Sequence, residues 1–224
     1  MPVLVRINFL NVASILAGFS NKQQTVAPNA EEKTVLIPKS DYFSDAINKV
    51  NPSIVAIQSF YNGQLARHGS GIILTQDGLI ATLNSLVPSY SSLFQVTQDG
   101  KIYKAKIIFR NYTKNVAIIS IPETDLQVAN LKPTSPNLGQ DLLILSRLVN
   151  FSKDNPFVEE ALVSQVSDNG QFQISSQYNQ DIYGAALMDN EGQIFGILDF
   201  GNQKPVIVTS EIIEGALTAA LTKL

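Results

Sequence analysis

Side chains that act as bases or nucleophiles near neutral pH are scarce in this sequence. Its 224 residues include one histidine, His68, and no cysteine. The absence of cysteine excludes disulfides, thiol nucleophiles, zinc fingers and iron–sulfur clusters. A single imidazole also excludes metal sites that need two of them. Any mechanism with a histidine base must therefore use His68, and we expect neither a metal nor another cofactor.

Carboxylates are the second source of catalytic groups, and four of them lie in or beside glycine turns. Paired carboxylates are typical of glycosidases and calcium loops, but no stretch matches the Asp-x-Asp-x-Asp-Gly ligand series. Asp-Gly and Asn-Gly pairs are favoured in tight hairpin turns. Hairpins therefore account for all four aspartates, which are Asp77, Asp99, Asp168 and Asp189.

The composition is that of a globular protein without a nucleic-acid partner. Apolar residues make up 45% of the chain and charged residues 16%, so a sizeable core is expected. The formal net charge is −3. A negative balance gives no electrostatic basis for binding nucleic acid.

Short β-rich runs separated by glycine turns make up most of the chain after residue 52. A helix is expected at Asp41–Val50 and a closing amphipathic helix at Glu211–Leu224. Evenly spaced short strands favour a sandwich or barrel, and two matched series favour two barrels. The expected first series is Ser53–Phe60, Arg67–Leu74, Gly78–Thr82, Leu93–Thr97, Lys101–Phe109 and Val116–Ile121. The second is Asp141–Ser146, Val158–Val166, Gln171–Ser176, Gly184–Met188, Gln193–Asp199 and Pro205–Thr209.

The N-terminal end differs from the rest. Within residues 1–20, Arg6 precedes an uncharged run from Ile7 to Phe19. This run is shorter than the ~20 residues of a membrane span, and it fits the apolar part of a secretory signal or a marginal membrane anchor. An extra strand or a frayed terminus is the alternative. We therefore expect an extracytoplasmic, secreted or membrane-anchored protein. The proposed organisation is this segment, a linker at 21–40, a first barrel with its entry helix at 41–122, a connector at 123–140, and a second barrel with its closing helix at 141–224.

Three separate stretches share a pattern with one family. The first is Gly69–Leu74 followed by Asp77–Thr82, the second is Asn111–Ile119, and the third is Asp181–Asp189 followed by Gly192–Ile197. Together they resemble trypsin-like serine proteases of the HtrA type, and the resemblance covers roughly residues 41–221. It implies an all-β fold, a trypsin-like double six-stranded antiparallel β-barrel with a short N-terminal helix and a C-terminal helix.

The same resemblance locates the positions of the catalytic triad. The family's histidine, aspartate and serine positions correspond here to Ser85, Asn115 and Tyr183. The oxyanion-loop positions correspond to Asp181, Ile182, Tyr183 and Gly184. Asp181 stands where the family has a glycine whose N–H binds the developing oxyanion.

These residue types do not suit the family's reaction, which needs a base, a group that orients it, and an activated hydroxyl. The hydroxyl of Ser85 has no proton affinity near neutral pH, and the amide of Asn115 carries no charge to stabilise an imidazolium. Tyr183 provides a phenol with an ordinary pKa of ~10 and more bulk than serine. His68 lies on the expected second strand or at its entry, upstream of Ser85. We expect this end of the hairpin to be the wrong one for His68 to face Tyr183.

The sequence thus predicts a pseudoprotease that acts by binding a protein or an extended peptide, with scaffolding or regulation as its role. Family members often form trimers through an N-terminal segment, and Tyr42 and Phe43 lie in the matching region, so a homo-oligomer is a further expectation. One alternative is an active serine endopeptidase that uses His68 in a non-standard catalytic set. The other is a β-rich binding protein unrelated to the family.

Overall fold

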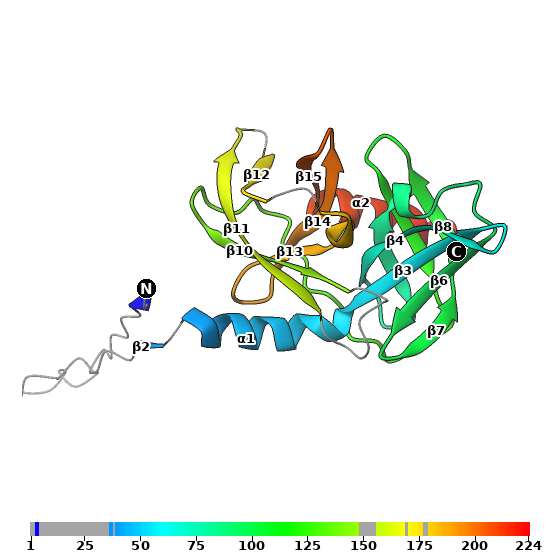
Figure 1. Cartoon of the computed structure of the whole chain (residues 1–224), viewed down its shortest axis with the longest axis horizontal. Coiled ribbons are helices and arrows are strands. Elements are labelled where there is room, and N and C mark those ends of the chain that lie inside the picture. Colours follow the sequence, from blue (N-terminus) through cyan, green and yellow to red (C-terminus); the bar gives the residue numbers. More distant parts are fainter. Residues whose placement is uncertain (1–2, 5–35, 38, 148–155, 169, 177–178) are drawn as a thin grey trace, which may run out of the picture. The chain divides into compact units, whose positions relative to one another are not determined.

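Two antiparallel sheets form from the short apolar runs (Figure 1). In the first sheet the strand order is β7-β6-β3-β4-β5-β9-β8, and in the second it is β12-β11-β10-β13-β14-β15. The edge strands β12 and β15 contact each other, which gives the second sheet a barrel-like curvature. The first sheet contains β3 (Ile54–Tyr61), β4 (Gln64–Ile73), β5 (Leu79–Leu83), β6 (Leu93–Gln98), β7 (Lys101–Lys104), β8 (Lys106–Asn111) and β9 (Val116–Ser120). The second contains β10 (Asp141–Ser146), β11 (Phe157–Val166), β12 (Phe172–Ile174), β13 (Ala186–Met188), β14 (Ile194–Gly201) and β15 (Lys204–Thr209).

The computed structural model describes residues 3–4, 36–37, 39–147, 156–168, 170–176 and 179–224. Contacts divide the chain into two units, Met1–Tyr42 and Phe43–Leu224. In the first unit, β1 (Val3–Leu4) pairs antiparallel with β2 (Leu36–Ile37). The helix α1 (Lys39–Val50) begins in this unit and ends in the second. The apolar run at 7–19, on which the signal or anchor prediction rests, lies outside the described residues, as does most of the expected linker.

The predicted fold class is confirmed, with one difference in strand number. The run Lys101–Phe109, expected to be one strand, forms two, because the chain changes its pairing partner at Ala105. β7 pairs with β6, whereas β8 pairs with β9. The buried Ala105 between them donates its N–H to Phe94 O at 2.9 Å. The first sheet therefore has seven strands rather than six.

The hairpin turns follow the chemistry expected from the sequence. Asn62 and Asp99 have φ values of +50° and +47°, and each precedes a glycine at +76°. Two successive left-handed residues define the tight turn that matches the twist of antiparallel strands, and asparagine, aspartate and glycine adopt it most readily. These turns fix the register of β3 with β4 and of β6 with β7.

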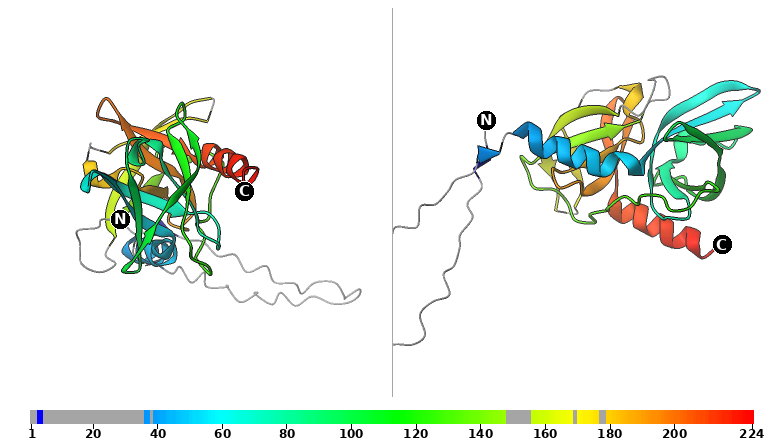
Figure 2. Two further views of the ribbon diagram at one scale, coloured as in Figure 1. Left: turned by 90° about the vertical axis from the view of Figure 1, so that its right-hand side faces the viewer. Right: turned by 90° about the horizontal axis from the view of Figure 1, so that it is seen from below.

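One apolar core joins the two sheets. Residues of the first sheet such as Ile72 and Leu83 share a buried cluster with Leu143 and Ile197 of the second. The helix α2 (Ser210–Leu221) contacts β8 and β9 as well as β14 and β15, so it spans both sheets (Figure 2). Ile213, Ala216 and Ala220 on this helix are buried, as expected for an amphipathic helix. Leu221, at the end of its last turn, is exposed.

In the described part of the chain, no helix has both the length and the apolar character needed to cross a membrane.

Candidate functional site

Three loops meet at one cleft of about 560 Å³. The short helix η2 (Asn84–Leu86) follows β5 directly and carries Ser85. The turn between β8 and β9 carries Asn115, and Tyr183 follows the short helix η3 (Gln180–Ile182). The side chains of all three residues line the cleft. The structure therefore brings the three predicted positions together, although they come from separate parts of the sequence.

Asn115 is the centre of a hydrogen-bond network in this cleft. Its Nδ2 donates to Ser85 Oγ at 3.2 Å and to Asp199 Oδ2 at 2.7 Å. Its Oδ1 accepts from the backbone N–H of Ser85 at 2.9 Å, and its carbonyl accepts from the N–H of Asn84 at 3.1 Å. Asn115 has a φ of +48°, a conformation that asparagine adopts more readily than most residues. The left-handed turn and the side-chain amide together hold η2 in place.

The segment around Tyr183 is held against β4 by close backbone approach. Ser70 donates its N–H to Tyr183 O at 2.8 Å. Gly184 has a φ of +72°, and a Cβ there would lie 2.2 Å from Ser70 O. A Cβ at Gly69 would lie 2.6 Å from Tyr183 O. Glycine is therefore needed on both sides of this contact, at Gly69 and at Gly184.

The ring of Tyr183 forms part of the cleft wall. It packs against Phe200 on β14, with ring centroids 5.5 Å apart and planes inclined by 57°. Tyr183 is half-buried and Phe200 is buried, so Phe200 lies behind the phenol ring. A bulky aromatic side chain thus occupies the position at which the family resemblance places a small nucleophile.

Three of the four oxyanion-loop positions, Asp181, Ile182 and Gly184, donate their N–H groups to other atoms of this chain. Asn179 caps η3 by accepting the N–H of Asp181 on Oδ1 at 3.0 Å. The N–H of Gly184 donates to Leu198 O at 2.7 Å. Ile182 is fully buried in the core of the second sheet. The N–H of Asp181, the donor singled out by the resemblance, is thus already bonded within its own loop.

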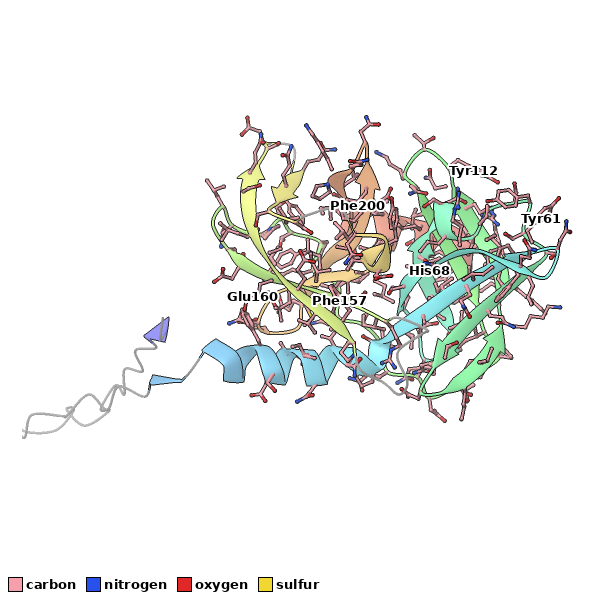
Figure 3. The ribbon with its side chains drawn as sticks, in the orientation of Figure 1. Tyr61, His68, Tyr112, Phe157, Glu160 and Phe200 are labelled. Atoms are coloured by element: carbon pink, nitrogen blue, oxygen red, sulfur yellow. The ribbon has the colours of Figure 1, made fainter. Side chains whose placement is uncertain are left out.

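The expectation that His68 lies away from Tyr183 is wrong. His68, labelled in Figure 3, is half-buried on β4. It lines the same cleft as Tyr183. The reason is the close approach at Gly69, which brings the preceding residue of β4 to the edge of the loop. In the described part of the chain, no hydrogen bond joins His68 to Ser85 or to Tyr183.

Asp199 is a site residue that the sequence analysis missed. It lies on β14 and lines the cleft beside Asn115. Its signal was present in the sequence, because it is the one charged residue within the apolar run of β14. The residues that the structure describes contain no group of three acidic, histidine or cysteine side chains able to hold a metal ion.

Chemically, the cleft contains a hydroxyl bonded to an amide rather than to a base. Ser85 Oγ accepts a hydrogen bond from Asn115 Nδ2. The side-chain amide of asparagine has no proton affinity near neutral pH. The carboxylate of Asp199 accepts from the same amide. Nucleophilic catalysis by a hydroxyl requires a base within hydrogen-bond reach of it.

Comparison with known proteins assigns this architecture. A family model described as a trypsin-like peptidase domain matches residues 69–197. The serine protease HTR4 of Rattus norvegicus is 27% identical over 177 residues, covering 71% of this chain and 36% of that protein. The serine endoprotease DegS of Haemophilus influenzae is 22% identical over 193 residues, covering 77% of this chain and 55% of that protein. The chain thus spans between about a third and just over half of the length of these relatives.

A solved structure shows the same fold. The crystal structure of the serine endoprotease from Yersinia pestis superimposes with a TM-score of 0.72 at 19% sequence identity. The alignment covers 83% of this chain and 68% of that one. Both barrel-like sheets therefore follow the arrangement found in that endoprotease.

Proposed function

Because this chain belongs to the trypsin-like peptidase domain family and is a homologue of HtrA-type serine proteases, we propose that it is a pseudoprotease, which binds a protein or an extended peptide without cleaving it. Its role is then to scaffold or regulate rather than to hydrolyse. The family match also removes one earlier alternative, a β-rich protein unrelated to this family.

The observation that carries this proposal is the network around Asn115. The family's reaction needs an imidazole between an acid group and the attacking hydroxyl. This chain has Ser85 at the imidazole position and Asn115 at the acid position; the two are hydrogen-bonded to each other, and Asn115 also donates to the carboxylate of Asp199. Neither the hydroxyl of Ser85 nor the amide of Asn115 can take a proton from a nucleophile near neutral pH.

The cleft itself supports a binding role. Its volume of about 560 Å³ lies within the ~300–1,000 Å³ typical of ligand sites. Its lining combines polar groups with aromatic and aliphatic side chains, including Tyr183 and Leu86. An extended peptide that enters a cleft of this kind can gain affinity from main-chain hydrogen bonds and from side-chain pockets.

The second candidate is an active serine endopeptidase, and the presence of His68 in the cleft favours it. In that case His68 would serve as the base for a serine in a non-standard catalytic set. The two candidates differ in whether any serine is activated, and this can be measured directly.

The test combines covalent labelling with turnover. The purified chain is treated with a fluorophosphonate probe, analysed by intact mass, and assayed with fluorescent casein. We expect neither labelling nor cleavage. Stoichiometric labelling of one serine that is lost in His68→Ala would overturn the proposal and establish the second candidate.

Peptide binding is tested with the wild-type chain and two tyrosine variants. Tyr183→Ala enlarges the cleft and is expected to change affinities across an array of extended peptides. Tyr112→Ala is the matched control, because Tyr112 is 69% exposed and does not line the cleft. Equal effects of the two variants would show that the peptides bind elsewhere.

Location and assembly complete the proposal. The apolar run at 7–19 supports an extracytoplasmic, secreted or membrane-anchored protein, and fractionation of cells that express the full chain tests this. A homo-oligomer, in particular a trimer, would assemble through the region of Tyr42 and Phe43. Phe43 is partly buried against the core of its own chain. Sedimentation velocity of wild type and Tyr42→Ala tests the assembly.

A further inference from the structure

We infer that the cleft recognises a positively charged group, the ammonium or guanidinium of a basic side chain, at the carboxylate of Asp199 beside the ring of Tyr183. This inference names the ligand chemistry of the cleft and so rests on the proposed binding function. It is carried by the partners of Asp199, the charges nearby, and the aromatic wall.

Asp199 has little compensation for its negative charge. In the part of the chain that the structure describes, its one polar partner is Asn115 Nδ2, which donates to Oδ2 at 2.7 Å. This donor is neutral. A carboxylate has two oxygens and about four acceptor positions, so most of its capacity is left for a ligand. A half-buried carboxylate in this state attracts a cation more strongly than one in bulk water.

A second aspartate, Asp189 in the turn after β13, has a fully compensated carboxylate. Asp189 Oδ1 accepts the N–H groups of Glu191 and Gln193 at 3.0 and 2.9 Å. Its Oδ2 lies 3.4 Å from Lys132 Nζ. Asp189 is thus bonded on both oxygens and paired with a cation. Asp199 has neither feature, although it lies in a cleft large enough for a ligand.

The cations that line the cleft do not neutralise Asp199. Arg67 and His68 both contribute to the lining. Arg67 is exposed, and its Nη1 donates to Ala66 O at 3.2 Å. Among the described residues, neither Arg67 nor His68 forms an ion pair with Asp199. Within the part of the chain that the structure describes, no cation is therefore paired with this carboxylate in place of a ligand.

The wall beside Asp199 suits the rest of a basic side chain. The phenol ring of Tyr183 is backed by Phe200 at 5.5 Å, and Leu86 contributes an apolar surface. Aromatic faces attract cations through their quadrupole, and lysine and arginine place apolar stems along such surfaces while their charged ends reach a polar group. The cleft offers both elements of this recognition in one place.

The direct test uses small probes and the full chain. Amide chemical shifts of ¹⁵N-labelled protein are followed during titration with n-butylammonium, with the neutral n-butanol, and with acetate. We expect butylammonium to shift Ser85, Asn115 and Asp199 in a saturable way, and the other two probes to have no such effect. Acetate binding at these residues, or equal binding of the amine and the alcohol, would overturn the inference without the need for any variant.

A charge-removing variant provides the second arm. Asp199→Asn keeps an oxygen that can accept from Asn115 Nδ2 but removes the negative charge. Loss of one charge-assisted hydrogen bond should weaken butylammonium binding about 10- to 100-fold. Asp77→Asn is the matched control, because Asp77 is exposed in a turn and does not line the cleft. Unchanged binding in Asp199→Asn would overturn the inference.

Peptides separate this inference from the function on which it rests. Two otherwise identical extended peptides carry either lysine or its neutral isostere norleucine. If the lysine and norleucine peptides bind in the cleft with equal affinity, the inferred cation site is wrong and the proposed binding function still holds. Butylammonium that binds at Asp199 while no peptide binds would support the cation site and overturn peptide binding.

Discussion

The side-chain amide of Asn115 donates a hydrogen bond to the carboxylate of Asp199 over 2.7 Å and thereby links the β8–β9 turn to strand β14. The second N–H of this amide points to Ser85 Oγ at 3.2 Å, and its oxygen accepts the N–H of Ser85. An asparagine side-chain amide has two N–H donors and one acceptor oxygen, and all three form hydrogen bonds here. A carboxylate at position 115 could replace the oxygen but neither donor.

Asn115→Asp should therefore destabilise the fold at neutral pH, because two carboxylates would face each other. We expect a loss of about 1–3 kcal/mol, measured by urea unfolding at pH 7. In this variant the pKa of the carboxylate pair is raised in the folded state above its unfolded value. The penalty is therefore present above the raised pKa and disappears as the pH falls through it.

The double variant Asn115→Asp, Asp199→Asn provides the control for this prediction. It restores an amide beside a carboxylate, so most of the stability should return. Asn111→Asp tests a nearby asparagine whose Oδ1 accepts from Lys114 N and whose change should cost little. If the double variant loses as much free energy of unfolding as the two single variants together, the two residues do not interact.

Gly184→Ala should be far more damaging than an equivalent change in a turn. Gly184 and Gly100 have almost the same backbone angle, with φ values of +72° and +76°. A Cβ at Gly184 would meet Ser70 O at 2.2 Å, whereas at Gly100 no atom lies within 4 Å. Gly100→Ala should cost about 1 kcal/mol for the left-handed backbone alone. Gly184→Ala should cost roughly 3 kcal/mol or more because the backbone must also move apart. Thermal unfolding of the two variants side by side measures the difference, and similar losses would contradict it.

Much of the fold could be predicted because its signals are local. Asn62-Gly63 and Asp99-Gly100 specify tight turns through backbone angles that these residue types adopt most readily. The alternation of apolar residues then fixes which strand faces enter the core. The break at Ala105 was missed because it depends on a change of pairing partner from β6 to β9, which no local pattern records.

The site was harder to predict because its geometry depends on contacts between distant segments. Ser85, Asn115 and Tyr183 could be located because the segments around them resemble motifs of the HtrA-type family. Asp199 was missed, because its role follows from the packing of β14 against the β8–β9 turn. His68 was misplaced for the same reason, since its distance from Tyr183 depends on how closely Gly69 allows β4 to approach the loop.

Ser70 joins the two sheets, and Ser70→Ala should weaken that junction. Ser70 Oγ accepts the N–H of Arg147 at 2.9 Å and lies 3.3 Å from Arg147 O, and it is fully buried. Removal of the hydroxyl leaves the Arg147 N–H buried without this acceptor, at a cost of about 1–3 kcal/mol. Ser92→Ala is the control, because Ser92 Oγ donates to Phe60 O at an exposed site. Chemical denaturation should show a clear loss for the first variant and almost none for the second.

Tyr103 and Glu123 form a hydrogen-bonded pair whose titration can be observed. The bond to Glu123 is the main reason that the pKa of Tyr103 rises from 10.0 to about 12, with burial as the next cause. The same bond holds the pKa of Glu123 below its ordinary value. The contribution of Tyr103 to stability is therefore fully present below pH ~10 and is lost as the pH rises toward about 12. The contribution of Glu123 is present above its ordinary pKa and is lost as the pH falls through its lowered value.

Glu123→Gln removes the charge that stabilises the protonated phenol. The pKa of Tyr103 should then fall back toward ~10, and phenolate absorbance near 295 nm, compared with that of Tyr103→Phe to isolate this residue, should appear at lower pH. In Tyr103→Phe, the pKa of Glu123 should rise, as followed by NMR of its side-chain carboxyl. Because both changes depend on one bond, the two shifts must occur together. A Glu123 pKa that stays low in Tyr103→Phe, together with an unchanged Tyr103 titration in Glu123→Gln, would show that the bond between them controls neither group.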